Sequence, residues 1–284
     1  MSRPVLGTPQ RAALWLGVLA LLLRLLYLYE AADSLFFEVP VVDAKSYVDG
    51  ALELSSSSWL GPSRPFWQPP LYPYILGLIY SICGPGVWAP HLLQALVGAG
   101  ICALLYLIAY RVFPPSVALG AALAATVYGP LIYFGGELLP TLLGIGLDLL
   151  LVYVLLGRMS DKELTPKRWL LAGVLLGLSA LAVANALLFL PMLLLWLAWT
   201  HHRAGTETRR ILLNGGLLLL GSGLIIAPVT ARNYFVGADW VLISSNAGVN
   251  FYIGNNPDYE QTVNIRPGQQ WSELVEMPER VAGI

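Results

Sequence analysis

The sequence is poor in charge and in cysteine. Only 12% of its 284 residues are Asp, Glu, Lys or Arg, and the formal net charge is −1. No basic stripe therefore indicates a nucleic-acid partner. The two cysteines, Cys83 and Cys102, lie in apolar surroundings and have neither the number nor the spacing of a disulfide framework or a metal-binding motif. These absences argue against a disulfide-built secreted domain, a cysteine-bound metal centre and a nucleic-acid-binding protein.

Long apolar segments are what the sequence has in abundance. Hydrophobic residues make up 57% of the chain, and the mean hydropathy is +0.67. A helix needs about 20 apolar residues to cross the ~30 Å hydrocarbon layer of a membrane. The segments are continuously apolar, whereas the strands of a membrane barrel alternate in polarity. We therefore predict an all-α, polytopic transmembrane helical bundle with about seven spans, at residues 11–31, 88–113, 116–134, 138–157, 169–185, 186–200 and 211–230.

The basic residues predict the orientation of this bundle. With a cytoplasmic N-terminus, the positive-inside rule is obeyed by every inner segment. The inner residues are Arg3, Arg11, Arg111, Arg158, Lys162, Lys167, Arg168, Arg203, Arg209 and Arg210, and the outer ones are Lys45, Arg64, Arg232, Arg266 and Arg280. The outer loop 32–88, Glu137 and the tail 233–284 then share the extracytoplasmic side.

The outer loop 32–88 is the largest polar segment between two predicted spans. Within it, residues 43–54 place apolar side chains on one helical stripe, which predicts an amphipathic helix at the interface. Residues 71–82 are apolar but too short to span, and Pro69 and Pro70 stand where helices start. We predict a second juxtamembrane helix there. The chain divides into a transmembrane module, 1–232, and a polar extracytoplasmic tail, 233–284, that begins a further C-terminal region.

Four segments carry a resemblance to a known family. They are PFWQPPLYPYILGLIY at 65–80, which follows Asp43 and Tyr47, YFGGELLPTLLGIGLDLLL at 133–151, IIAPVTARNYFVG at 225–237, and LISSNAGVNFYIGNNP at 242–257. Together they resemble the integral-membrane glycosyltransferases of the GT-C superfamily. More narrowly, they are similar to bacterial members of family 39, the protein-mannosyltransferase and aminoarabinose-transferase group. The resemblance covers residues 11 to about 257.

The resemblance implies a reaction and its partners. A sugar would pass from a polyprenyl-phosphate donor to an acceptor hydroxyl on a glycan, lipid or protein, with inversion at the anomeric carbon. It also implies an integral protein of the bacterial inner (cell) membrane, surrounded by membrane lipids, with its site facing the periplasm or exterior. No nucleotide-binding fold is needed, and we predict no cofactor and no metal. The alternative to the absence of a metal is a divalent ion bound at Glu137.

Two acids are predicted to be catalytic. An inverting transfer needs a general base beside the acceptor hydroxyl and a way to stabilise the leaving phosphate. The resemblance implies Asp43 as the base, and Glu137 as an acid that orients the acceptor or the base. Each has a purely structural alternative, since an Asp can cap a helix and an acid is stabilised at a helix N-terminus.

The remaining predicted site residues would bind substrate. Arg232 is the candidate for the leaving phosphate because a guanidinium makes bidentate contacts with phosphate oxygens; otherwise it is a snorkelling arginine. Arg24 either reaches up to the same phosphate or pairs with Asp148 inside the bundle. Gln68 can donate a hydrogen bond but supplies no charge where some relatives have lysine. The other candidates are Lys45, Tyr47, Tyr72 and Asn233, with Arg64 as a further helper.

Two other function classes compete with the enzyme. A transporter or flippase for a lipid-linked sugar would have broken helices at the midplane and internal repeats, and we find no convincing repeat. A non-catalytic membrane assembly subunit that kept the fold would tolerate loss of Asp43.

Overall fold

The chain forms helices and no strands over the part that the structure, a computed structural model, describes: residues 8–157, 164–203 and 207–257. The elements are α1 (Pro9–Ala31), α2 (Leu35–Glu38), α3 (Val42–Ser56), α4 (Leu71–Cys83), α5 (Trp88–Val112), α6 (Pro115–Thr126), α7 (Gly129–Tyr133), α8 (Thr141–Leu156), α9 (Pro166–Ala182), the 3₁₀ turn η1 (Ala184–Leu188), α10 (Phe189–Arg203), α11 (Thr208–Phe235) and α12 (Asn246–Gly254). The predicted all-α fold is confirmed over these residues.

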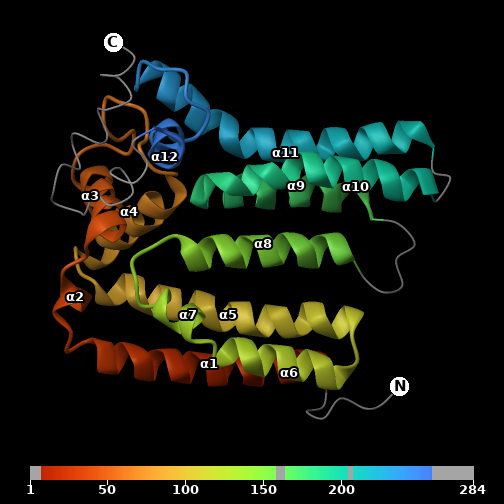
Figure 1. The fold of residues 1–284 in the computed structure, drawn as a ribbon, viewed down its shortest axis with the longest axis horizontal. Coiled ribbons are helices and arrows are strands. Elements are labelled where there is room, and N and C mark those ends of the chain that lie inside the picture. Colours follow the sequence, from red (N-terminus) through yellow and green to blue (C-terminus); the bar gives the residue numbers. More distant parts are fainter. Residues whose placement is uncertain (1–7, 158–163, 204–206, 258–284) are drawn as a thin grey trace.

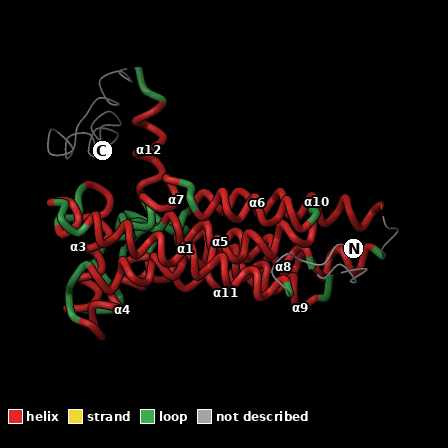
Figure 2. Tube along the Cα trace, turned by 90° about the horizontal axis from the view of Figure 1, so that it is seen from below, coloured by secondary structure: helices red, strands yellow, loops and turns green. Residues whose placement is uncertain are grey.

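The long helices lie side by side in a bundle, and α2, α3, α4 and α12 gather at one end (Figure 1). α1 packs on α5, α5 on α6 and α8, α8 on α9, and α9 on α11. α3 and α4 pack on each other at the end of the bundle, and Figure 2 shows α12 projecting away from the long helices. This arrangement places the outer-loop helices together at one end.

Over residues 8–157, 164–203 and 207–257, three helices are long and apolar enough to cross a membrane by themselves: α1, α5 and α11. The other predicted spans form shorter apolar helices. The stretch 116–134 is divided between α6 and α7, which starts at Gly129 with Pro130 in its first turn. α9 ends at Ala182, and the joint predicted at Asn185 lies in the 3₁₀ turn that leads into α10. α11 continues to Phe235, past the boundary predicted at residue 232.

Both helices predicted in the outer loop are confirmed as α3 and α4. α3 buries Tyr47, Ala51 and Leu54, which belong to the predicted apolar stripe, while Leu52 stays exposed. Tyr47 and Ala51 form one cluster with Tyr72, Leu76 and Tyr80 of α4. An apolar face on each helix therefore holds the pair together.

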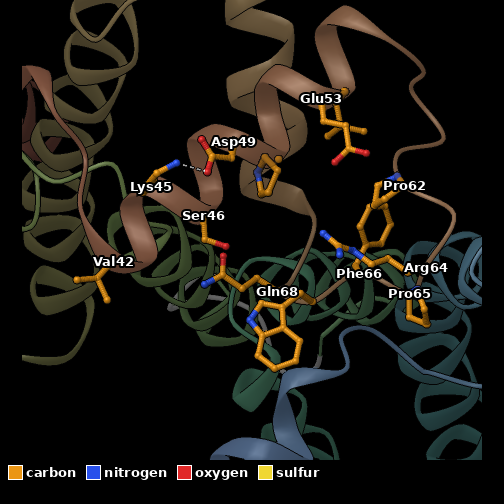
Figure 3. Close-up of a pocket in the computed structure, with 14 residues that line it drawn as sticks. Val42, Lys45, Ser46, Asp49, Glu53, Pro62, Arg64, Pro65, Phe66 and Gln68 are labelled. Carbon is orange, nitrogen blue, oxygen red and sulfur yellow. Dashed lines mark hydrogen bonds and ion pairs between the residues drawn. The ribbon is translucent and has the colours of Figure 1, made fainter. Parts of the chain in front are cut away.

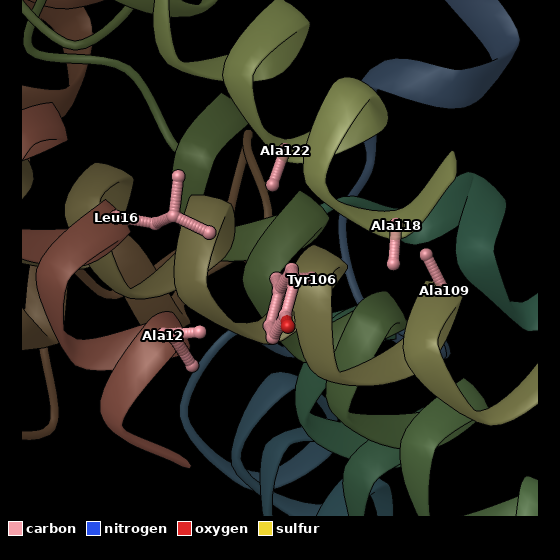
Figure 4. Packing of buried hydrophobic residues seen from close by; sticks show 7 residues of the cluster. Ala12, Leu16, Tyr106, Ala109, Ala118 and Ala122 are labelled. Atoms are coloured by element: carbon pink, nitrogen blue, oxygen red, sulfur yellow. The ribbon is translucent and has the colours of Figure 1, made fainter. Parts of the chain in front are cut away.

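Small side chains dominate the contacts between the long helices. Figure 4 shows Ala12 and Leu16 of α1 on the side of Tyr106 of α5, and Ala109 of α5 facing Ala118 of α6; Ala122 of α6 belongs to the same cluster. Lipid tails are as apolar as leucine, so helices in a membrane associate through close van der Waals packing, which small residues allow.

The closest helix approach is between α9 and α11. A Cβ atom added at Gly173 would lie 2.2 Å from the carbonyl oxygen of Leu218, and one at Gly221 would lie 2.4 Å from that of Leu170. Backbone atoms cannot move aside as a flexible side chain can. We therefore expect Gly173→Ala to destabilise the protein by about 1–3 kcal/mol through overpacking.

Unfolding in mixed detergent micelles measures this loss, and Gly216→Ala is the matched control. Gly216 lies on α11 and a Cβ there meets no atom within 4 Å. Alanine is the better helix former by about 1 kcal/mol, so the control should be neutral or slightly stabilised. Equal effects of the two substitutions would contradict the packing argument.

The predicted pair between Arg24 and Asp148 does not form. Arg24 is 2% exposed, and its Nη1 donates to the carbonyl oxygen of Ala20 at 3.0 Å while Nη2 lies 3.6 Å from Cys102 Sγ. Asp148 instead accepts a hydrogen bond of 2.6 Å from Ser179 Oγ. Each group has a nearer partner on its own or an adjacent helix. The room for Arg24 comes from Gly98, whose added Cβ would lie 2.4 Å from Arg24 Nε.

Candidate active site

A cavity of about 340 Å³ lies between α3 and the loop that leads to α4 (Figure 3). Its volume is at the lower end of the range for small-molecule pockets. Its wall is mixed, with cations, carboxylates, hydrogen-bonding groups and aromatic rings. The lining residues are Val42, Lys45, Ser46, Asp49, Gly50, Glu53, Leu54, Pro62, Arg64, Pro65, Phe66, Trp67, Gln68 and Pro73. Such a wall suits a polar ligand better than a lipid tail.

Asp43 is not among the residues that line this cavity, but it follows Val42 and contacts Gln68, which both line it. It lies in the first turn of α3, is exposed, and accepts a hydrogen bond of 3.4 Å from Gln68 Nε2. The preceding residue, Val42, has φ of +52°, a left-handed conformation that is costly for a β-branched side chain. Such strain is often found at functional sites. The two predicted site residues Asp43 and Gln68 are thus in contact.

The cavity side of α3 carries further charged and polar groups. Lys45 Nζ and Asp49 Oδ2 form an ion pair of 2.5 Å across one helical turn. Glu53 follows one turn later and also lines the cavity. In Figure 3, the hydroxyl of Ser46 and the side-chain amide of Gln68 point toward each other across the cavity. Hydroxyl groups of a ligand would find several hydrogen-bond acceptors on this wall.

Tyr47 and Tyr72 connect α3 to the rest of the bundle. Their ring centroids lie 5.5 Å apart in an edge-on contact, and Tyr72 Oη donates to Gln94 Oε1 of α5 at 2.7 Å. Burial, and then the charge of Asp43, raise the pKa of Tyr47, and burial raises the pKa of Tyr72 well above its ordinary value. Both phenols therefore keep their protons at neutral pH and act as packing and donor groups.

The backbone of Glu137 is fixed by a hydrogen bond from a side chain of α5. Gln94 Nε2 donates to the carbonyl oxygens of Gly135 at 3.1 Å and Glu137 at 2.6 Å. Glu137 is half-buried and is not among the residues that line the cavity beside Asp43. Its predicted catalytic role stays a prediction.

Gln94 and His91 are polar residues of α5 that were not among the predicted site residues. His91 is buried against Phe37, with one ring nitrogen 2.7 Å from the carbonyl oxygen of Val87 and the other 3.0 Å from that of Gly136. Both residues therefore fix the loop that carries Glu137. The available signal was two polar side chains spaced i, i+3 at the start of an otherwise apolar helix, which places them on one face.

The Arg232 side chain is hydrogen-bonded to backbone carbonyl groups of the outer loop. It is 8% exposed and donates from Nε to the carbonyl oxygen of Leu60 and from Nη1 to that of Arg64, both at 2.6 Å. Nη2 donates to the carbonyl oxygen of Pro62, and the guanidinium lies 4.1 Å from the ring centroid of Phe66. The side chain is therefore a clamp on residues 60–66. Its predicted contact with phosphate stays a prediction.

Asn233 is a second clamp beside it. The side chain is fully buried, and its Oδ1 accepts from the Phe66 backbone N–H at 3.2 Å. Its Nδ2 donates to the carbonyl oxygens of Val241 and Ile243, each at 3.0 Å. Asn233 thus joins the outer loop to the segment after α11, and it has no contact with the cavity.

An apolar groove of about 660 Å³ lies between η1, α10 and α11. Its lining includes Leu190 and Ile226 along the helices, and Tyr234, Trp240 and Leu242 near the clamped end. Among residues 8–157, 164–203 and 207–257, no group of three or more His, Cys, Asp or Glu is placed to hold a metal ion. The predicted lack of a metal cofactor stays a prediction.

One comparison with known proteins gives a result. The family model described as dolichyl-phosphate-mannose-protein mannosyltransferase matches residues 67–230, which is more than half of the chain. No curated protein and no solved structure matches the chain. The matched region begins at Trp67 in the cavity wall and ends two residues before Arg232.

Proposed function

Because the chain belongs to the dolichyl-phosphate-mannose-protein mannosyltransferase family, membrane glycosyltransferases of the GT-C type, we propose that it transfers a sugar from a polyprenyl-phosphate donor to an acceptor hydroxyl. The observation that carries this proposal is the contact between Asp43 and Gln68 at the edge of the mixed polar cavity. A carboxylate and a hydrogen-bond donor are held together there, at the end of a bundle of apolar helices.

In the proposed step, the acceptor oxygen attacks the anomeric carbon of the donor sugar. The new C–O bond forms as the bond to the phosphate oxygen breaks, and the polyprenyl phosphate leaves with the bonding electrons. Asp43 takes the hydroxyl proton as the nucleophile develops charge. Gln68, which donates to Asp43 Oδ1, keeps the carboxylate oriented. Inversion follows from attack on the face opposite the leaving phosphate.

We also propose that the seven predicted stretches all cross the membrane with the N-terminus inside. The distribution of charge in the folded chain supports this. The basic residues of the described part that were predicted to be inside lie at the helix ends far from the cavity, namely Arg11, Arg111, Lys167, Arg168, Arg203, Arg209 and Arg210 (Figure 1). The cavity end, with Asp43 and Glu137, would then face the periplasm or exterior.

The donor's isoprenoid tail would lie in the apolar groove on α11, which is the larger of the two cavities described here and is lined mostly by apolar side chains. The acceptor would approach the exposed edge at Asp43 from the aqueous side. A glycan, a lipid or a protein could each supply the hydroxyl.

A transfer assay in right-side-out membrane vesicles tests the function and its sidedness together. Labelled sugar should pass from polyprenyl-phosphate sugars in the vesicle membrane to acceptors added outside. In the same vesicles, a membrane-impermeant maleimide should label Cys83, which is exposed at the end of α4, and spare the buried Cys102. Labelling of Cys83 only after permeabilisation would contradict the orientation, and vesicles labelled as expected but inactive with a broad donor panel would contradict the function.

A further inference from the structure

Within the part of the chain that the structure describes, three cations lie at the cavity end and have different partners. Lys45 is paired with Asp49, and Arg232 is bound to carbonyl oxygens of the outer loop. Arg64 is exposed and lines the cavity, and its side chain makes no hydrogen bond or ion pair to the part of the chain that the structure describes. Figure 3 shows its guanidinium turned into the space between the loop and α3. Arg64 is therefore the cation available to a ligand there.

The backbone of Arg64 is fixed although its side chain is free. Its carbonyl oxygen accepts the 2.6 Å hydrogen bond from Arg232 Nη1. Pro65 follows it, and a residue before proline is restricted to extended conformations. Pro62, two residues earlier, is bound by Arg232 as well. Because the backbone of Arg64 is fixed and its guanidinium is not hydrogen-bonded to the described residues, the side chain can bind an anion without a rearrangement of the loop.

We propose that Arg64 binds the phosphate of the donor, and that Arg232 is a positioning residue that acts through the backbone of Arg64. This assignment rests on the proposed function and names the charged group that its leaving phosphate meets. A guanidinium makes two parallel hydrogen bonds with phosphate oxygens and stays charged at any physiological pH. Such a contact stabilises the negative charge that the phosphate gains as the sugar leaves.

The opposite wall fits the rest of the same ligand. Asp49, Glu53 and Ser46 on α3 present oxygen acceptors to sugar hydroxyl groups, while Lys45 offsets the charge of Asp49. With its phosphate on Arg64, a phosphosugar would extend toward α3, the helix that carries Asp43. The ligand class is therefore a polyhydroxylated phosphate ester and not a neutral glycan.

The test measures phosphate binding and folding separately. The probe is undecaprenyl monophosphate in lipid nanodiscs that hold the purified full chain, and its dissociation constant is measured for each variant. Arg64→Gln should bind about 10- to 100-fold more weakly, as expected for loss of hydrogen bonds to a charged group, with unchanged thermal unfolding. Arg64→Lys should recover part of the affinity. Arg209→Gln, an exposed arginine at the far end of α11, should bind as the wild type does.

Arg232→Lys separates positioning from direct binding. Lysine cannot contact three loop carbonyls in the guanidinium geometry, so this variant should unfold at a lower temperature and exchange the Phe66 amide faster. Wild-type affinity in Arg64→Gln, or lost affinity in Arg232→Lys with normal unfolding and exchange, would overturn the assignment. An Arg64→Gln enzyme that transfers sugar with the wild-type KM would overturn it too, whereas a wild-type chain that transfers no sugar would overturn the function itself.

Discussion

Replacement of Asp43 by asparagine is expected to lower kcat for sugar transfer by about 10²- to 10⁴-fold, the usual contribution of a general base. Asparagine keeps the oxygen that accepts the hydrogen bond from Gln68, so the local geometry should persist. What it loses is the ability to take a proton from the acceptor hydroxyl. The KM for the donor should therefore change little. Transfer of labelled sugar in proteoliposomes, at saturating donor, measures both parameters.

The matched control is Asp33→Asn. Asp33 is an exposed acid in the same outer loop, between α1 and α2, and it does not line the cavity. Its substitution should leave kcat within error of the wild type. If Asp43→Asn transfers sugar at the wild-type rate, Asp43 has no part in proton transfer. If the substitution also has no effect on growth of cells that depend on the chain, the transporter or the assembly subunit becomes the better account.

The helices could be predicted because their signals are local. α3 is encoded by the stripe that includes Tyr47, Ala51 and Leu54, and α4 by an apolar stretch that follows two prolines. Apolar length alone marked α1, α5 and α11. The division of the third stretch could also have been read, because Gly129 and Pro130 are both poor residues for a helix interior.

The roles of the arginines could not be predicted in the same way. A sequence shows that Arg232 lies near the C-terminal end of α11 but not that three carbonyl groups of residues 60–64 point at it. The sequence separation between these partners is about 170 residues. Arg24 is a similar case, because the space it occupies depends on Gly98 in another helix. The hydrogen-bond partners of a long side chain such as arginine therefore depend on which groups the tertiary fold places near it.

Only some of the residues at the candidate site were predicted from the sequence. Asp43 and Gln68 were predicted from the resemblance and lie in contact, whereas Asp49 and Glu53 line the cavity beside Gln68 without having been singled out. Asp49 and Glu53 carry no motif, and the common face of the lining residues appears only once α3 has packed against the loop. The chemistry of the site therefore depends on how firmly that loop is held.

Replacement of Asn233 by alanine tests this dependence and should destabilise the protein by about 3–5 kcal/mol. The change strands the Phe66 N–H and the carbonyl oxygens of Val241 and Ile243, and each buried polar group left without a partner costs about 1–3 kcal/mol. Because Phe66 precedes Trp67 and Gln68, release of the loop should also lower the rate of sugar transfer. Unfolding in mixed micelles and hydrogen exchange of the Phe66 amide measure the two effects.

Two further variants separate the hydrogen bonds from side-chain volume. Asn233→Asp keeps the acceptor for Phe66 but loses both donors, and it places a carboxylate beside two carbonyl oxygens. The free energy of unfolding of Asn233→Asp should therefore be no higher than that of Asn233→Ala. The new carboxylate would lie close to the Arg232 guanidinium, whose Nη1 is 3.3 Å from Asn233 Oδ1 in the wild type. Asn250→Ala, at an exposed position of α12, should change neither stability nor exchange. If Asn233→Ala unfolds like Asn250→Ala, the loop is held by its other contacts, which are the hydrogen bonds from Arg232 and those from the backbone N–H groups of Ser245 and Asn246 to Phe66 and Trp67.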